Sequence, residues 1–142
     1  CTGVLSSEQA VADEVGGADL VVSAVMVAGR RAPVVIMESM IKSMSRGSVI
    51  VDIAIDQGGS VENIQATSYE QPVYTRHGVL HYAVPNMPGA VPRTASQALS
   101  SAVLPYVVEL LEKGVAGSGL KAATAVQNGD VVDPVLKEEL GL

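Results

Sequence analysis

Residues 48–59 read SVIVDIAIDQGG, and this stretch decides the fold that we expect. The run from Ser48 to Ile55 is rich in Val and Ile and lacks regular apolar–polar alternation, which is typical of a strand covered on both faces. The polar and glycine residues 56–59 then end the run. The stretch therefore predicts a buried strand with a polar turn at its carboxyl end.

Two similar runs lie on either side of this strand in the sequence. The first is Asp19–Val27 (DLVVSAVMV), and the second is Val79–Val84 (VLHYAV), which the residues PNMPG close. Between the first two runs, Pro33–Met44 carries apolar residues at helical spacing. The order strand, helix, strand, connection, strand predicts an α/β fold whose three strands are parallel and joined by right-handed crossovers.

Other elements flank this core. A short helix is expected after the Ser6-Ser7 cap and before Gly16-Gly17, and a long helix kinked by Pro105 is expected over Thr94–Lys113. About 20 residues between the second and third strands predict an irregular loop with a functional or docking role. Near the end, Asn128-Gly129 indicates a hairpin, and a last helical turn is expected near Leu136.

The composition excludes several classes of protein. The 142 residues are 48% apolar and carry a net charge of −6, so neither disorder nor a nucleic-acid partner is expected. No run is long and apolar enough for a membrane span, and a cytoplasmic location is expected. A single cysteine, Cys1, forms no internal disulfide, and because residue 1 is not Met we expect a piece of a longer protein.

The carboxyl ends of the three parallel strands are expected to share one edge of the sheet. Residues 25–29, Asp56–Gly59 and Asn86–Gly89 would meet there, and ligands of open α/β sheets bind beyond such ends. An Asp can exchange a proton, an Asn both donates and accepts, and Gly allows close approach. The alternative is plain turn chemistry, since turns use the same residues.

Other candidates are weaker. Residues 117–122 match the dinucleotide pattern G-x-G-x-x-A but follow a helix instead of a strand, so we reject them. His77 and His81 are interpreted as structural, and Cys1 has no neighbouring base that would make it a nucleophile. Arg93 either has a carboxylate or phosphate partner or is solvated. No spacing typical of metal ligands is present, so no metal is expected.

Four segments carry a family resemblance. They are ADLVVSAVMVAGRRAP, GSVIVDIAIDQGG, HGVLHYAVPNMPGAVPRTAS and AVLPYVVELLEKG. In this order they resemble the C-terminal half of NAD-dependent alanine dehydrogenase. The NAD-binding subunit of proton-translocating transhydrogenase is similar in the first two segments, but its second motif ends with Glu, so Asp56-Gln57 favours alanine dehydrogenase.

The resemblance implies reversible oxidative deamination of L-alanine to pyruvate and ammonium, with NAD as hydride acceptor. It implies that residues 1–93 form the second half of a Rossmann-type, doubly wound parallel sheet. Residues 94–142 would then be a long helix and tail of the substrate domain. A missing N-terminal half would supply the phosphate-binding loop and the other catalytic groups, and the family forms homo-oligomers, commonly hexamers.

The resemblance also implies roles for single residues. Asp56 resembles the catalytic acid/base, Asn86 faces the substrate, and Ser6 lies near the adenine. The residues that resemble NAD contacts are Ser6, Val25, Met26, Ile53, Ala54, Ile55, Asp56, Val84, Pro85, Asn86 and Met87.

Two alternatives remain open. One is a truncated, non-catalytic fragment with a binding or assembly role, in which the exposed edge of the Asp19–Val27 strand pairs with another chain. The other is a transhydrogenase-like NAD-binding component.

Overall fold

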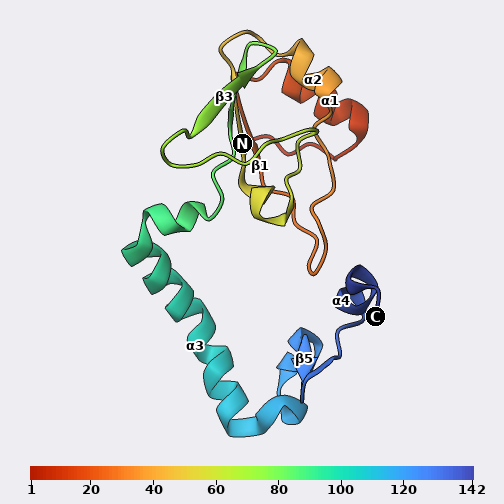
Figure 1. Ribbon diagram of the computed structural model, residues 1–142, viewed down its shortest axis with the longest axis vertical. Helices are drawn as coiled ribbons and strands as arrows, with labels where there is room; N and C mark the ends of the chain where they lie inside the picture. Colours follow the sequence, from red (N-terminus) through yellow and green to blue (C-terminus); the bar gives the residue numbers. More distant parts are fainter. The chain divides into compact units, whose positions relative to one another are not determined.

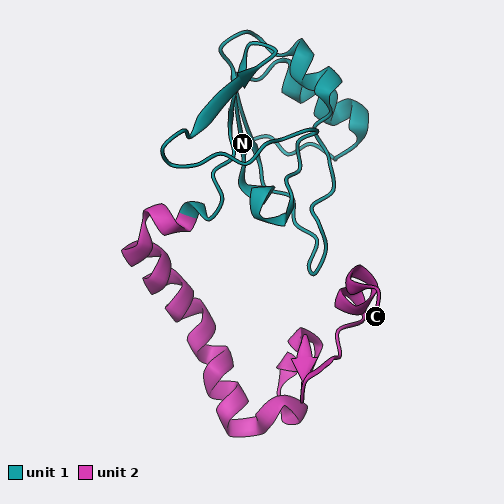
Figure 2. Ribbon diagram, in the orientation of Figure 1, with its two compact units in different colours: residues 1–87 teal, residues 88–142 magenta.

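The computed structural model describes residues 1–142 and divides into two compact units, residues 1–87 and residues 88–142 (Figure 2). Four short strands form the sheet of the first unit. The strands are β1 (Leu20–Ser23), β2 (Val49–Asp52), β3 (Val73–Arg76) and β4 (Val79–Tyr82), in the order β1-β2-β4-β3. The predicted strands β1, β2 and β4 are parallel, which confirms the α/β fold class.

Strand β3 is an addition that the sequence interpretation missed, because it lies in the segment predicted as an irregular loop. It pairs antiparallel with β4 across a tight turn at His77-Gly78, where φ is 54° and 82°. The expectation of a purely parallel sheet is therefore wrong at this edge. Its sequence, VYTR, mixes polar and apolar residues, and none of its side chains is fully buried. It therefore lacks the continuous apolar run that marks the other three strands.

The two helices of this unit are α1 (Glu8–Gly16) and α2 (Glu38–Ser43). The side chain of Ser7 caps α1 by accepting a hydrogen bond from the amide of Ala10 at 3.1 Å, as the Ser-rich start predicts. Helix α2 is shorter than predicted because the residues before it are extended, and Ile36 pairs with Val61 in an isolated parallel bridge.

Strands β1 and β2 also end earlier than predicted. After β2, Asp52 accepts a hydrogen bond from the amide of Ala54, and the chain turns into the 3-10 helix η1 (Ile53–Gln57). The predicted strand end at Ile55 is therefore wrong. An acid that caps the following turn ends the strand although the residues after it are apolar.

One face of the sheet carries the core, because α1 and α2 pack against it (Figure 1). The buried core residues are Val15, Ile36, Met40, Ile41, Met44, Ile50, Val61 and Val79. Side chains alternate between the faces of a strand, and on the other face Leu20 is 59%, Val22 54% and Val73 47% exposed. The opposite face is therefore apolar and uncovered.

The second unit contains α3 (Pro92–Gly117), η3 (Gly119–Ala123), β5 (Val126–Gln127), β6 (Asp130–Val131) and α4 (Pro134–Leu140); η2 (Met87–Ala90) joins it to the first unit. The predicted hairpin is confirmed, with φ of 53° at Asn128 and 90° at Gly129. Helix α3 departs from helical torsion angles at Gly114 and not at Pro105. It contains no buried residue, and no helix of the protein is long and apolar enough to cross a membrane.

Candidate functional site

Asp56 and Asn86 come together where η1 meets the loop between β4 and η2. Both carboxylate oxygens of Asp56 lie within hydrogen-bond distance of the backbone amide of Asn86, at 3.0 and 3.2 Å. Both residues are exposed. The structure thus places two of the predicted site residues in direct contact and leaves the carboxylate accessible to a ligand.

The backbone of Asn86 is held from a second side. Asn86 adopts the left-handed conformation, with φ of 53°. The hydroxyl of Tyr69 donates to the carbonyl oxygens of Asn86 and Met87, at 3.2 and 3.4 Å. The sequence interpretation marked the segment that contains Tyr69 as functional or docking but did not single out this residue.

Asp52 forms a buried hydrogen-bond network at the start of η1, the short helix that carries Asp56. Its side chain is fully buried, and its Oδ1 accepts from the Ala54 amide at 2.9 Å and from the Ser60 hydroxyl at 3.0 Å. Its Oδ2 accepts from the amides of Ser60 and Val61, at 2.7 and 3.2 Å. The Ser60 hydroxyl also bonds to that of Ser23 at 2.6 Å, so the network joins the ends of β1 and β2. The position of Asp52 inside the apolar run SVIVDIAI is the sequence signal that could have identified this network.

The two glycines after Asp56 have a conformational role. Gly58 and Gly59 have φ of 94° and 82°, which disfavours other residues. A Cβ on Gly59 would clash with Cγ2 of Ile64, and one on Gly58 would lie 2.9 Å from Nε of Arg31. The motif that follows Asp56 is therefore a tight turn as well as part of the candidate site.

The other predicted contact residues differ in exposure. Met26 is 70% and Ile53 46% exposed, so both offer apolar surface at the carboxyl ends of β1 and β2. Ala54 and Val84 are buried as whole residues, and the amide and carbonyl of Ala54 are bonded to Asp52 and Gly59. Pro85 is exposed, whereas Val25, Ile55 and Met87 are half-buried.

Ser6 lines a pocket of about 230 Å³ at the start of α1. The other lining residues are Ser7, Glu8, Val11, Val34, Val35 and Met37. The pocket therefore combines hydroxyl groups with an apolar wall. Sequence reasoning placed Ser6 near a ligand but did not identify the apolar residues around it.

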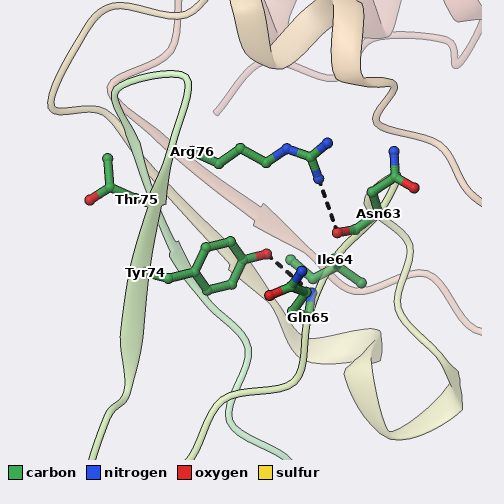
Figure 3. A pocket seen from close by; sticks show the side chains of 6 residues that line it. All are labelled: Asn63, Ile64, Gln65, Tyr74, Thr75 and Arg76. Atoms are coloured by element: carbon green, nitrogen blue, oxygen red, sulfur yellow. Dashed lines mark hydrogen bonds between the residues drawn. The ribbon is translucent and has the colours of Figure 1, made fainter.

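A second pocket, of about 720 Å³, contains none of the predicted site residues (Figure 3). Between its two sides, Tyr74 Oη accepts from the Gln65 amide at 3.1 Å, and Arg76 donates to the carbonyl oxygen of Asn63 at 3.2 Å. Arg76 also forms an ion pair with Glu38 at 2.7 Å, so its charge is already compensated. The hydrogen bonds of this pocket hold the loop against β3.

Glu38 is the centre of a charged cluster that the sequence interpretation missed. Besides Arg76, it contacts His77 at 2.8 Å and Lys42 at 3.4 Å. The hydrogen bond from His77 is the largest cause that lowers the pKa of Glu38 from 4.5 to about 2, with further contributions from Asn63, Arg76 and Lys42. The cluster fastens the start of α2 to the β3–β4 turn.

His81 is buried in β4 and stacks on Tyr74, with ring centroids 5.0 Å apart. Its Nδ1 lies 3.0 Å from the carbonyl oxygen of Val79, and burial lowers its pKa below 6.5. Neither His77 nor His81 contacts Asp56 or Asn86. The rejected G-x-G-x-x-A match at residues 117–122 spans the end of α3 and part of η3.

Comparisons with known proteins agree with one another. The family model "Alanine dehydrogenase/PNT, C-terminal domain" matches residues 1–134. The chain is 44% identical to an alanine dehydrogenase of Bacillus subtilis (strain 168), over 97% of this chain and 38% of that protein. It is also 44% identical to alanine dehydrogenase 1 of Staphylococcus aureus (strain NCTC 8325 / PS 47), over 80% of this chain and 31% of that protein.

Solved structures give the same result. An L-alanine dehydrogenase superposes with a TM-score of 0.76 at 45% identity, and the match covers 96% of this chain and 39% of that one. A transhydrogenase from Sinorhizobium meliloti superposes with a TM-score of 0.69 at 26% identity, covering 91% and 36%. The chain thus spans less than two-fifths of the length of these proteins.

Proposed function

Because the chain belongs to the alanine dehydrogenase/PNT C-terminal domain family, we propose that it supplies the NAD side of an alanine dehydrogenase site. The proposed reaction is the reversible oxidative deamination of L-alanine to pyruvate and ammonium. NAD, when bound, supplies the hydride acceptor, and the protein supplies binding, orientation and proton exchange.

The contact between Asp56 and Asn86 is the observation that carries this proposal. A carboxylate that is exposed at the carboxyl edge of a parallel sheet can take a proton from an amine or a water molecule and return it. The Asn86 amide fixes the carboxylate, and the Asn86 side chain offers both a donor and an acceptor to a substrate. We assign acid/base catalysis to Asp56 and substrate orientation to Asn86.

The surface around this pair fits NAD. Met26 and Ile53 present apolar side chains where a nicotinamide ring and its ribose would lie. The pocket lined by Ser6, Val34 and Val35 suits a planar base, because small-molecule sites combine an apolar wall with a few polar groups. We assign it to the adenine. Of the remaining proposed contacts, Val25, Ile55, Pro85 and Met87 can act through exposed or half-buried side chains, whereas the buried Ala54 and Val84 would support the surface that the cofactor touches.

The uncovered apolar surface of the sheet supports the proposal that this chain is part of a larger protein. Parallel sheets are covered on both faces, yet Leu20 and Val22 are more than half exposed and β1 is an edge strand. We propose that an N-terminal half packs here and contributes the phosphate-binding loop. Residues 1–93 would then complete the NAD-binding domain, and residues 94–142 would complete the substrate domain. The whole protein would be a cytoplasmic homo-oligomer, with the hexamer as the expected form.

The same exposed edge also fits a second function, a non-catalytic fragment that binds another chain. A transhydrogenase-like component is less well supported, because the solved transhydrogenase shares 26% identity against 45% for the L-alanine dehydrogenase. Alanine-dependent NADH formation separates the first proposal from both.

The test of Asp56 uses the active protein that carries this chain. We expect Asp56→Asn to lower turnover by about 100-fold or more, because the amide cannot act as a general base. Binding of NAD should persist, since the amide oxygen still accepts from Asn86. Asp130→Asn, which makes the same charge change at an exposed residue of the β5–β6 hairpin, is the control. Unchanged turnover in Asp56→Asn would remove Asp56 from the mechanism.

A further inference from the structure

Tyr69 reaches the candidate site from a segment that lies outside the regular elements of the sheet. Its side chain is half exposed, yet its hydroxyl is committed to the backbone carbonyls of Asn86 and Met87. Asn86 therefore has its amide bonded to Asp56 and its carbonyl bonded to Tyr69. One hydrogen bond therefore restrains the peptide group before the Asn86 Cα, and the other restrains the peptide group after it.

The segment around Tyr69 is itself anchored close to the site. The Thr67 amide donates to the carbonyl of Ala83 at 3.0 Å, and the Ala83 amide donates to the Thr67 hydroxyl at 3.3 Å. The following turn is closed between Ser68 and Gln71, whose amide donates to the Ser68 hydroxyl at 3.3 Å. Tyr69 thus projects from a turn that is attached to the strand leading to Asn86.

A left-handed backbone is a minority conformation for residues other than glycine, although Asn tolerates it better than most. Only in a fixed conformation do the Asn86 amide and side chain keep a constant relation to Asp56. A hydrogen bond to the Asn86 carbonyl opposes rotation of the peptide that follows, and the bond to the Met87 carbonyl opposes rotation of the next one.

We propose that Tyr69 is a positioning residue for the Asp56–Asn86 pair: its hydroxyl fixes the backbone of Asn86 and Met87 in the conformation that binds NAD. The inference rests on the proposed function, since it assigns that role at the same site. Tyr69 acts through these backbone groups and takes no part in proton exchange.

The experiment compares Tyr69→Phe with Tyr106→Phe. The first keeps the ring and removes the bonded hydroxyl, and the second removes a hydroxyl from the exposed side chain of Tyr106 on α3. Hydrogen–deuterium exchange of the backbone segment that contains Asn86 is followed by mass spectrometry in the active protein that carries this chain. We expect exchange about five-fold faster in Tyr69→Phe, the effect of losing one net hydrogen bond, and no change in Tyr106→Phe.

The second readout is kinetic and uses the active protein. In Tyr69→Phe the KM for NAD should rise by about five-fold with kcat changed by less than about two-fold, because the loss affects binding of the ground state and the transition state alike. Unchanged exchange at Asn86, or an unchanged KM in a variant of an active protein, would overturn the positioning role. Absence of NADH formation by the unsubstituted protein would instead refute the proposed function.

Discussion

Replacing Asp52 by Asn should destabilise the protein strongly although the two side chains have nearly the same shape. The carboxylate accepts from three backbone amides and one hydroxyl, and donates nothing. The best placement of an Asn keeps its oxygen toward the amides of Ser60 and Val61. Its NH₂ group then faces the Ala54 amide, where two donors meet, while the Ser60 hydroxyl can rotate to accept.

The size of the loss follows from these contacts. One buried amide without a partner costs about 1–3 kcal/mol, and two remaining bonds lose charge assistance of about 1 kcal/mol each. We therefore expect Asp52→Asn to lower the free energy of unfolding by about 3–5 kcal/mol, which is a large share of the stability of a typical domain. Urea denaturation at equilibrium measures this change.

Asp19→Asn is the matched control, because Asp19 is exposed and should change stability by less than about 0.5 kcal/mol. A loss below about 1 kcal/mol in Asp52→Asn would refute the reasoning, since even one unsatisfied buried amide should cost that much.

Three other substitutions test the supporting structure. Gly59→Ala should lower the urea midpoint by the equivalent of about 2 kcal/mol or more, because the added methyl group meets Ile64 at a positive φ; a neutral effect would refute this packing. Glu38→Gln should also lower the midpoint near neutral pH. The pKa of Glu38 falls to about 2 in the folded protein, so the ionised side chain stabilises the fold fully above pH 4.5. The difference in stability between Glu38→Gln and the unsubstituted protein should therefore vanish as the pH falls toward 2. The folded protein keeps the pKa of His81 below 6.5, so the unfolded chain binds the proton more readily and stability should fall as the pH drops below 6.5. In His81→Gln, thermal unfolding between about pH 7 and pH 5 should show a smaller pH dependence, and an equal slope would contradict this assignment.

The sequence was sufficient for the elements whose signals are local. Runs without alternation predicted the three parallel strands, Ser7 predicted the start of α1, and Asn128-Gly129 predicted the hairpin. The prediction failed where a distant partner decides the structure. Residues 73–76 become a strand because β4 offers them an edge, and Ile36 leaves the predicted helix to pair with Val61.

The candidate site divides in the same way. The polar residues at the strand ends were recognisable from the sequence, and the structure brings Asp56 and Asn86 into contact. Tyr69 and Ser60 were not recognisable, because each acts on residues far away in the sequence through a hydroxyl group that no local pattern distinguishes. Their roles depend on the fold as a whole.

We propose that this chain forms the NAD side of an alanine dehydrogenase site, and one measurement tests this most directly. The most direct measurement takes the protein from its native source, determines its intact mass and follows NADH formation from NAD with and without L-alanine. We predict L-alanine-dependent NADH formation by a protein substantially larger than the 142-residue chain. A protein of the size of this chain that forms no NADH with L-alanine would contradict the claim and favour a binding or assembly role.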